Sequence, residues 1–145
     1  MAEAAFTRAR VNRGAADEGG FQRLRRELGV ESFGLNLITL RPGQRNRVHL
    51  HQRQEEVYVV LEGELTLVVE GEQVVLGRFE LARVGASVRR QLTNPTSEPV
   101  LLLALGGYGE HEGRDALAWT SWEEGGEGRP PQEVPLPEDL PGPSD

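Results

Sequence analysis

The stretch Gly43-Gln-Arg-Asn-Arg-Val-His49-Leu-His51-Gln-Arg-Gln-Glu-Glu56-Val-Tyr-Val-Val-Leu-Glu-Gly63 decides the fold prediction. Its short alternating run at 48–51 predicts a strand, on which side chains two positions apart point to the same face. The two imidazoles therefore lie side by side. Glu56 starts the next β-prone run after a polar turn, and an antiparallel pairing would bring its carboxylate to that face. Two neutral imidazoles and a carboxylate suit a divalent Fe, Mn, Ni, Cu or Zn ion.

An ordinary structural role for each of these residues is the competing interpretation. A lone histidine on a strand is usually just a polar residue, and Glu55 with Glu56 could be a solvated acidic pair. The concentration of these residue types favours a site, because the chain has three histidines and two of them stand here. The third, His111, falls in a loose C-terminal stretch and is expected to have no ligand role.

Outward from this stretch, the pattern predicts about eight short strands and no helix between them. Tight glycine or polar turns separate the strands. Such a series favours an antiparallel sandwich or a closed barrel, because closing a sheet removes its exposed edges. The expected strands are residues 33–40, 48–51, 57–61, 65–69, 73–76, 79–84, 88–93 and 99–105.

The flanks predict smaller, less regular elements. Residues 1–31 form an arm and a short helix, since Phe21, Leu24 and Leu28 recur at helical spacing and Gly29 can end the helix. Residues 107–124 are expected to dock on the barrel through Trp119 and Trp122. The tail at 125–145 holds six prolines and several acidic residues, and we expect it to be disordered.

Composition limits the function classes. The 145 residues suffice for one domain. A net charge of −7 argues against a general nucleic-acid binder and against an anionic membrane surface as partner. The absence of cysteine and lysine excludes thiol nucleophiles, zinc–thiolate sites and a Schiff-base lysine within the chain. No stretch is long and apolar enough to cross a membrane, and the N-terminus does not resemble a signal peptide, so the expected location is cytoplasmic.

The glycine, histidine and glutamate spacing resembles the first conserved motif of the cupin superfamily. Gly43, His49, His51, Glu56 and Gly63 match it without a gap or substitution. The resemblance covers roughly residues 33–105. It implies an all-β double-stranded β-helix, or jelly-roll barrel, at 32–106, with His49, His51 and Glu56 as metal ligands and the two glycines in turns.

The second cupin motif departs from the family pattern. Alignment on Asn94 places Arg90 where the fourth ligand, a histidine, would stand. Arginine stays protonated and has no lone pair to offer a metal. In one interpretation three residues hold the metal and Arg90 grips an anionic ligand. Tyr58 could line the pocket beside them, although a core tyrosine with its hydroxyl satisfied is the favoured alternative. In the other there is no metal, and Arg90 forms an ion pair with Glu56.

The sequence leaves two classes of function open, because cupin barrels host many chemistries. One is a metal cupin that binds a small, anionic molecule, with a dioxygenase- or isomerase-like reaction as its enzymatic form. The other is a metal-free, non-enzymatic module that binds or senses a small ligand. In both cases we expect a homodimer that hides an edge strand or an apolar face, with the strand at 33–40 as a candidate.

Overall fold

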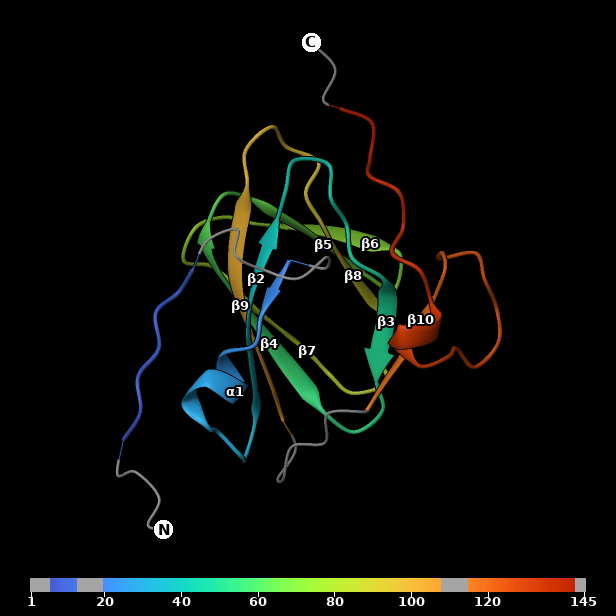
Figure 1. The fold of residues 1–145 in the computed structure, drawn as a ribbon. Helices are drawn as coiled ribbons and strands as arrows, with labels where there is room; N and C mark the ends of the chain where they lie inside the picture. Colours follow the sequence, from blue (N-terminus) through green and yellow to red (C-terminus); the bar gives the residue numbers. More distant parts are fainter. Residues whose placement is uncertain (1–5, 13–19, 108–114, 143–145) are drawn as a thin grey trace.

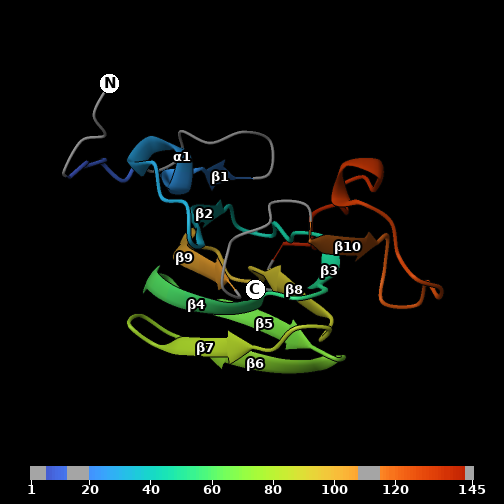
Figure 2. The same ribbon diagram turned by 90° about the horizontal axis from the view of Figure 1, so that it is seen from below.

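The computed structural model describes residues 6–12, 20–107 and 115–142. Two five-stranded antiparallel sheets face each other as a jelly-roll barrel (Figures 1 and 2). One sheet has the order β1-β2-β9-β4-β7 and the other β10-β3-β8-β5-β6. The strands are β1 (Phe21–Gln22), β2 (Gly34–Leu40), β3 (Val48–His51), β4 (Glu55–Glu62), β5 (Leu65–Val69), β6 (Glu72–Leu76), β7 (Leu81–Val84), β8 (Arg90–Thr93), β9 (Val100–Gly107) and β10 (Ala116–Trp119).

The barrel itself confirms the prediction of eight short strands, which are β2 to β9. Alternation explains how they pack, because every second side chain points between the sheets. On β9, Leu102 and Ala104 face this interior while Leu101 contributes to a second cluster outside it. The interior core consists of Ile38, Leu40, Tyr58, Val60, Leu65, Leu67, Leu76, Val84, Leu92, Val100, Leu102 and Ala104.

The turn glycines of the first motif occupy backbone positions that other residues rarely adopt. Gly43 has φ +83° and Gly63 has φ +77°. At Gly63 an added Cβ would lie 2.3 Å from the carbonyl oxygen of Pro99. A side chain there would therefore both strain the backbone and collide with the neighbouring turn.

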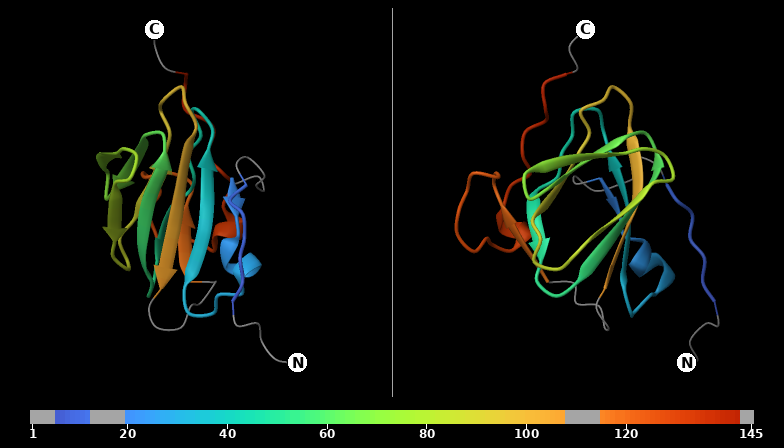
Figure 3. Two further views of the ribbon diagram at one scale, coloured as in Figure 1. Left: turned by 90° about the vertical axis from the view of Figure 1, so that its left-hand side faces the viewer. Right: turned by 180° about the vertical axis from the view of Figure 1, so that it is seen from behind.

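The N-terminal helix is shorter than predicted. Helix α1 spans Leu24–Leu28, and Gly29 ends it in the left-handed conformation, with its N–H donating to Arg25. Phe21 instead belongs to β1 and pairs with Ile38 on β2. The helix lies on the outer face of the first sheet (Figure 3). Its Leu24 packs against Leu37 and Leu101.

The C-terminal segment extends the second sheet. Strand β10 pairs antiparallel with β3, with Trp119 opposite Val48. The Trp119 side chain is buried, and the Arg89 guanidinium lies 4.3 Å from its ring centroid. Trp122 donates from Nε1 to Gln91 Oε1 at 3.0 Å. Both tryptophans thus contact the β8 region of the barrel.

The predicted disordered tail needs correction for residues 125–142. A 3₁₀ turn, η1 (Pro131–Glu133), is followed by Val134, which is 1% exposed. Arg47 donates to the Val134 carbonyl at 2.6 Å, and the Leu140 N–H donates to the Gly43 carbonyl at 2.7 Å. The composition argument missed this order because the segment gains its contacts from the barrel loop beside it rather than from itself.

The strand proposed for the dimer interface is not the edge of its sheet. β2 has β9 on one side and the short β1 beside Leu37 and Ile38 on the other. The homodimer, and an apolar face of this strand as its interface, stay predictions. Within the described part of the chain, no helix has the length and apolar character needed to span a bilayer.

Candidate metal site

The three predicted ligands come together from opposite sheets. His49 and His51 are on β3, and Glu56 is on β4. The sequence reasoning expected these strands to pair as a hairpin, and this is wrong, because β3 pairs with β10 and β8 while β4 pairs with β7 and β9. The short turn at 52–54 crosses from one sheet to the other. Glu56 therefore meets the histidines across the barrel interior.

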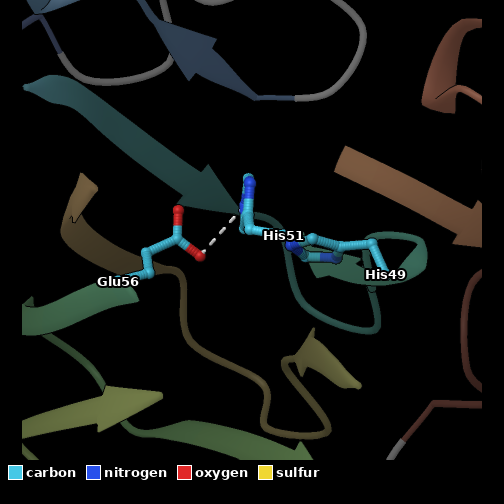
Figure 4. A group of neighbouring side chains, drawn as sticks. All are labelled: His49, His51 and Glu56. Carbon is cyan, nitrogen blue, oxygen red and sulfur yellow. Dashed lines mark ion pairs between the residues drawn. The ribbon is translucent and has the colours of Figure 1, made fainter. Parts of the chain in front are cut away.

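The donor atoms form a compact group. One ligand atom from each of His49, His51 and Glu56 lies within 4.8 Å of the others. His51 Nε2 is 3.5 Å from Glu56 Oε1, the contact drawn dashed in Figure 4. The two imidazoles stand at 87° to each other with centroids 5.5 Å apart.

His49 is prepared as a neutral ligand. Its Nδ1 lies 2.8 Å from the Arg47 carbonyl oxygen, which can only accept, so Nδ1 carries the proton and Nε2 keeps its lone pair. Burial lowers the pKa of His49 to about 4, and the charges of His51 and Arg90 act in the same direction against the opposing effect of Glu56. The ring is therefore uncharged at neutral pH.

Glu56 is held as an anion. Burial alone would raise its pKa, but the hydrogen bond from His51 and the positive charges of His51, His49 and Arg90 outweigh burial and lower the pKa to about 2. The Tyr58 hydroxyl donates a hydrogen bond to Oε1 of the same carboxylate. Burial and the charge of Glu56 hold the pKa of Tyr58 well above 10, so this hydroxyl keeps its proton.

Arg90 does not take the position expected of a ligand-gripping residue. Its side chain is 0% exposed, and its Nε lies 3.8 Å from Glu56 Oε1. Nη1 donates to the Val88 carbonyl at 2.8 Å and Nη2 to the Val84 carbonyl at 3.5 Å. With both terminal nitrogens bonded to the main chain, Arg90 supports the carboxylate rather than facing a ligand.

A cavity of about 180 Å³ opens beside these groups. Tyr58 borders it together with His49, His51 and Glu56, whereas Arg90 does not. Tyr58 is also a core residue with its hydroxyl bonded to Glu56, and its contact with a ligand stays a prediction. Sequence reasoning missed several lining residues because they come from segments without a motif. The lining is Phe21, Asn36, Ile38, Asn46, Arg47, His49, His51, Glu56, Tyr58, Leu92, Ala104, Ala116 and Pro131.

The residues present fit a divalent metal. The group combines a neutral imidazole with a free Nε2, a second imidazole and an ionised carboxylate, which is the donor set that transition metals bind. The fully buried cation of Arg90 beside this set opposes a further positive charge. His111 lies outside the described residues.

Comparison with known proteins agrees with this architecture. Residues 36–106 match the family model for the Cupin domain. The chain is 38% identical over 79 residues to the beta-D-galactosidase Rv1717 of Mycobacterium tuberculosis, covering 54% of this chain and 67% of that protein. The chain belongs to the cupin family, whose members commonly bind a metal.

Two solved structures place the fold among known cupins. One is a sugar phosphate isomerase from a cupin superfamily of Silicibacter pomeroyi, with 28% identity and a TM-score of 0.62 over 70% of this chain. This chain spans 65% of that protein's length. The other is a cupin protein from Bacteroides fragilis, with 19% identity and a TM-score of 0.64, covering 77% of this chain and 92% of that one. At that identity the second likeness concerns the fold alone.

Proposed function

We propose that this chain is a metal-binding cupin whose barrel cavity takes a small, oxygen-rich anion, such as a phosphorylated or acidic sugar derivative. The observation that carries the proposal is the grouping of His49, His51 and Glu56 donor atoms within 4.8 Å at the cavity wall. When bound, a divalent metal would supply Lewis-acid polarisation of a ligand oxygen. His49, His51 and Glu56 would hold it.

The cavity and the relatives support the ligand class. A volume of about 180 Å³ lies below the roughly 300–1,000 Å³ of pockets for drug-sized molecules, so the ligand is small. Arg47, Asn36 and Asn46 on the lining offer polar or positive groups to oxygen atoms. Two of the similar proteins are named for sugar chemistry, one as a galactosidase and one as a sugar phosphate isomerase.

As an enzyme, the chain would be isomerase-like, in line with the second of these relatives. Glu56 would then serve as an anionic ligand rather than as the proton acceptor, because a general base works best with a pKa near the working pH. A pKa of about 2 makes this carboxylate a weak base.

Metal analysis tests the proposal. Protein stripped with a chelator would be incubated with Fe, Mn, Ni, Cu or Zn, desalted and analysed for bound metal. We expect stoichiometric metal in the wild type and its loss in a His49→Ala/His51→Ala variant. His111→Ala is the matched control and should bind as the wild type does. A wild type that stays metal-free, or a double variant that binds normally, would overturn it.

The ligand class has its own test. Thermal unfolding of the metal-loaded protein would be measured with sugar phosphates, the corresponding neutral sugars and inorganic phosphate. Stabilisation by sugar phosphates, and less by neutral sugars, is expected from ligand binding to the folded state. The anionic ligand would be contradicted if neutral sugars stabilised the protein as much as their phosphates do. It would also be contradicted if none of the anions stabilised the protein.

A second candidate is a metal-free ligand-binding module. The observation that favours it is the Arg90–Glu56 ion pair at 3.8 Å, which places a cation beside the carboxylate without any metal. The same metal analysis distinguishes the two functions, since this candidate requires a wild type that takes up none of the five metals.

A further inference from the structure

We infer that Asp115, from the C-terminal segment, is a positioning residue for the candidate metal site. It lies outside the matched Cupin domain at 36–106 and outside both motifs. Its side chain is 4% exposed although it precedes β10 directly. A buried carboxylate needs partners to offset its lost hydration, and those partners define its role.

Asp115 bonds to the turn at 52–54, which connects β3, the strand of His51, with β4, the strand of Glu56. Its carboxylate accepts hydrogen bonds from the N–H of Arg53 at 3.1 and 3.0 Å and from the N–H of Gln54 at 2.9 Å. Its own carbonyl accepts from the Gln52 N–H at 3.0 Å. Because this turn carries the chain from His51 on one sheet to Glu56 on the other, Asp115 fixes the spacing between them.

The same carboxylate faces His51. Asp115 Oδ2 lies 3.9 Å from His51 Nδ1, which is buried and makes no hydrogen bond to any described residue. A metal-binding histidine ordinarily donates its other ring N–H to a carboxylate or carbonyl, which fixes the tautomer and the ring orientation. Asp115 is placed to be that acceptor, while His51 Nε2 points to Glu56.

His49 shows the same arrangement with a different acceptor. Its Nδ1 is held by the Arg47 carbonyl from its own strand. Among the described residues His51 Nδ1 has no such local acceptor, and the carboxylate that faces it, Asp115, comes from the far C-terminal side of the barrel sequence. Docking of the C-terminal segment and metal binding at His51 are therefore linked, an inference that rests on the proposed metal function.

An Asp115→Asn variant tests the inference, with Asp139→Asn as the matched control. Asp139 is on the same C-terminal segment, but its side chain is 47% exposed and forms an ion pair with Arg41. It makes none of the contacts with His51 or the turn at 52–54 that Asp115 makes. Titration of stripped protein with Zn²⁺ or Mn²⁺ should show binding at least about tenfold weaker for Asp115→Asn, within the 10–100-fold range for such acceptors. Asp139→Asn should bind as the wild type does. Unchanged affinity in Asp115→Asn would overturn the inference.

A second readout separates this inference from the metal proposal. The hydrogen bonds from the Arg53 and Gln54 N–H groups to Asp115 do not involve the metal, so exchange of these two amide hydrogens can be measured in metal-free protein. We expect slow exchange in the wild type and faster exchange at these two amides in Asp115→Asn but not in Asp139→Asn, whereas a general loss of packing would speed exchange throughout the barrel. Wild-type amides at 53 and 54 that exchange as fast as those of exposed loops would overturn the inference even if metal binds or the variant fails to fold. A wild type without metal affinity but with these two amides protected by Asp115 would overturn only the metal function.

Discussion

Arg90 Nε lies 3.8 Å from Glu56 Oε1, and the arginine side chain has no exposure to solvent. The pair crosses the barrel interior from β8 to β4. Arg90 also stands directly opposite His49 in the β3–β8 ladder. The residue in place of the family's fourth ligand thus puts a buried positive charge beside the carboxylate of the candidate site.

Replacing Arg90 by histidine should strengthen metal binding. The substitution removes a buried positive charge beside the site and adds an imidazole donor next to His49. We expect the dissociation constant for Zn²⁺ or Ni²⁺ to fall at least about tenfold, equivalent to about 1.4 kcal/mol. Arg90→Gln is the control, because it removes the charge without adding a strong ligand. Equal affinities of the two variants would show that position 90 does not reach the metal.

Replacing Arg90 by methionine should destabilise the metal-free protein. The variant leaves Glu56 without its buried cation and the carbonyls of Val84 and Val88 without their donors. Breaking a buried ion pair from one side costs about 3–5 kcal/mol of unfolding free energy. Urea unfolding with chelator present would measure the loss.

The matched control is a surface ion pair on the sheet that carries Glu56. Arg83 binds Glu55 but its side chain is 65% exposed, so Arg83→Met should cost less than about 1 kcal/mol. Equal losses in the two arginine variants would contradict the supporting role of Arg90.

Acid should destabilise the metal-free protein in two overlapping pH windows. His49 has a folded pKa of about 4 against 6.5 ordinarily, so only the unfolded chain gains this proton as pH falls from 6.5 to 4. Glu56 has a pKa of about 2 in the folded protein against 4.5 ordinarily. Only the unfolded chain therefore gains this second proton as the pH falls from 4.5 to 2. Each such proton lowers stability by about 1.4 kcal/mol per pH unit within its window.

Two variants assign these windows. His49→Gln should flatten the decline of unfolding free energy between pH 6.5 and 4, and Glu56→Gln should flatten it between 4.5 and 2. Chemical unfolding across this pH range measures the slopes. A wild-type slope in the upper window that His49→Gln leaves unchanged would show that His49 titrates normally.

Val134→Ala should show whether the C-terminal segment contributes to stability. Val134 is 1% exposed, and removing buried methyl groups typically costs about 1–3 kcal/mol. Gln132→Ala, exposed on the adjacent 3₁₀ turn, should change stability by less than about 0.5 kcal/mol. Thermal or urea unfolding measures both. A Val134→Ala variant as stable as the wild type would mean that the segment does not pack in solution.

The eight barrel strands and the ligand set were predictable because local features encode them. Alternating β-prone residues and glycines at tight turns mark strands whatever the rest of the chain does. The i, i+2 spacing of His49 and His51 puts both rings on one face of any strand. The route by which Glu56 joins them was not predictable, because a short turn can either form a hairpin or cross between sheets.

The positions of the flanking segments could not be predicted. Phe21, Ala116 and Pro131 reach the cavity lining from β1, β10 and η1, none of which belongs to a motif. The tail orders through single long-range contacts such as Arg47 with the Val134 carbonyl, 87 positions apart. Composition measures what a segment can bury by itself and carries no information on what it can bury against.

The sequence by itself thus determined the glycine, histidine and glutamate spacing, and with it the barrel and three of the groups at its centre. Only the tertiary structure decided that Arg90 supports Glu56 and that Asp115 holds the turn between the ligands. The physical reason is that local periodicity fixes which face a side chain occupies. Which groups then meet across the interior, and which lose solvent, depends on how both sheets and both flanking segments close.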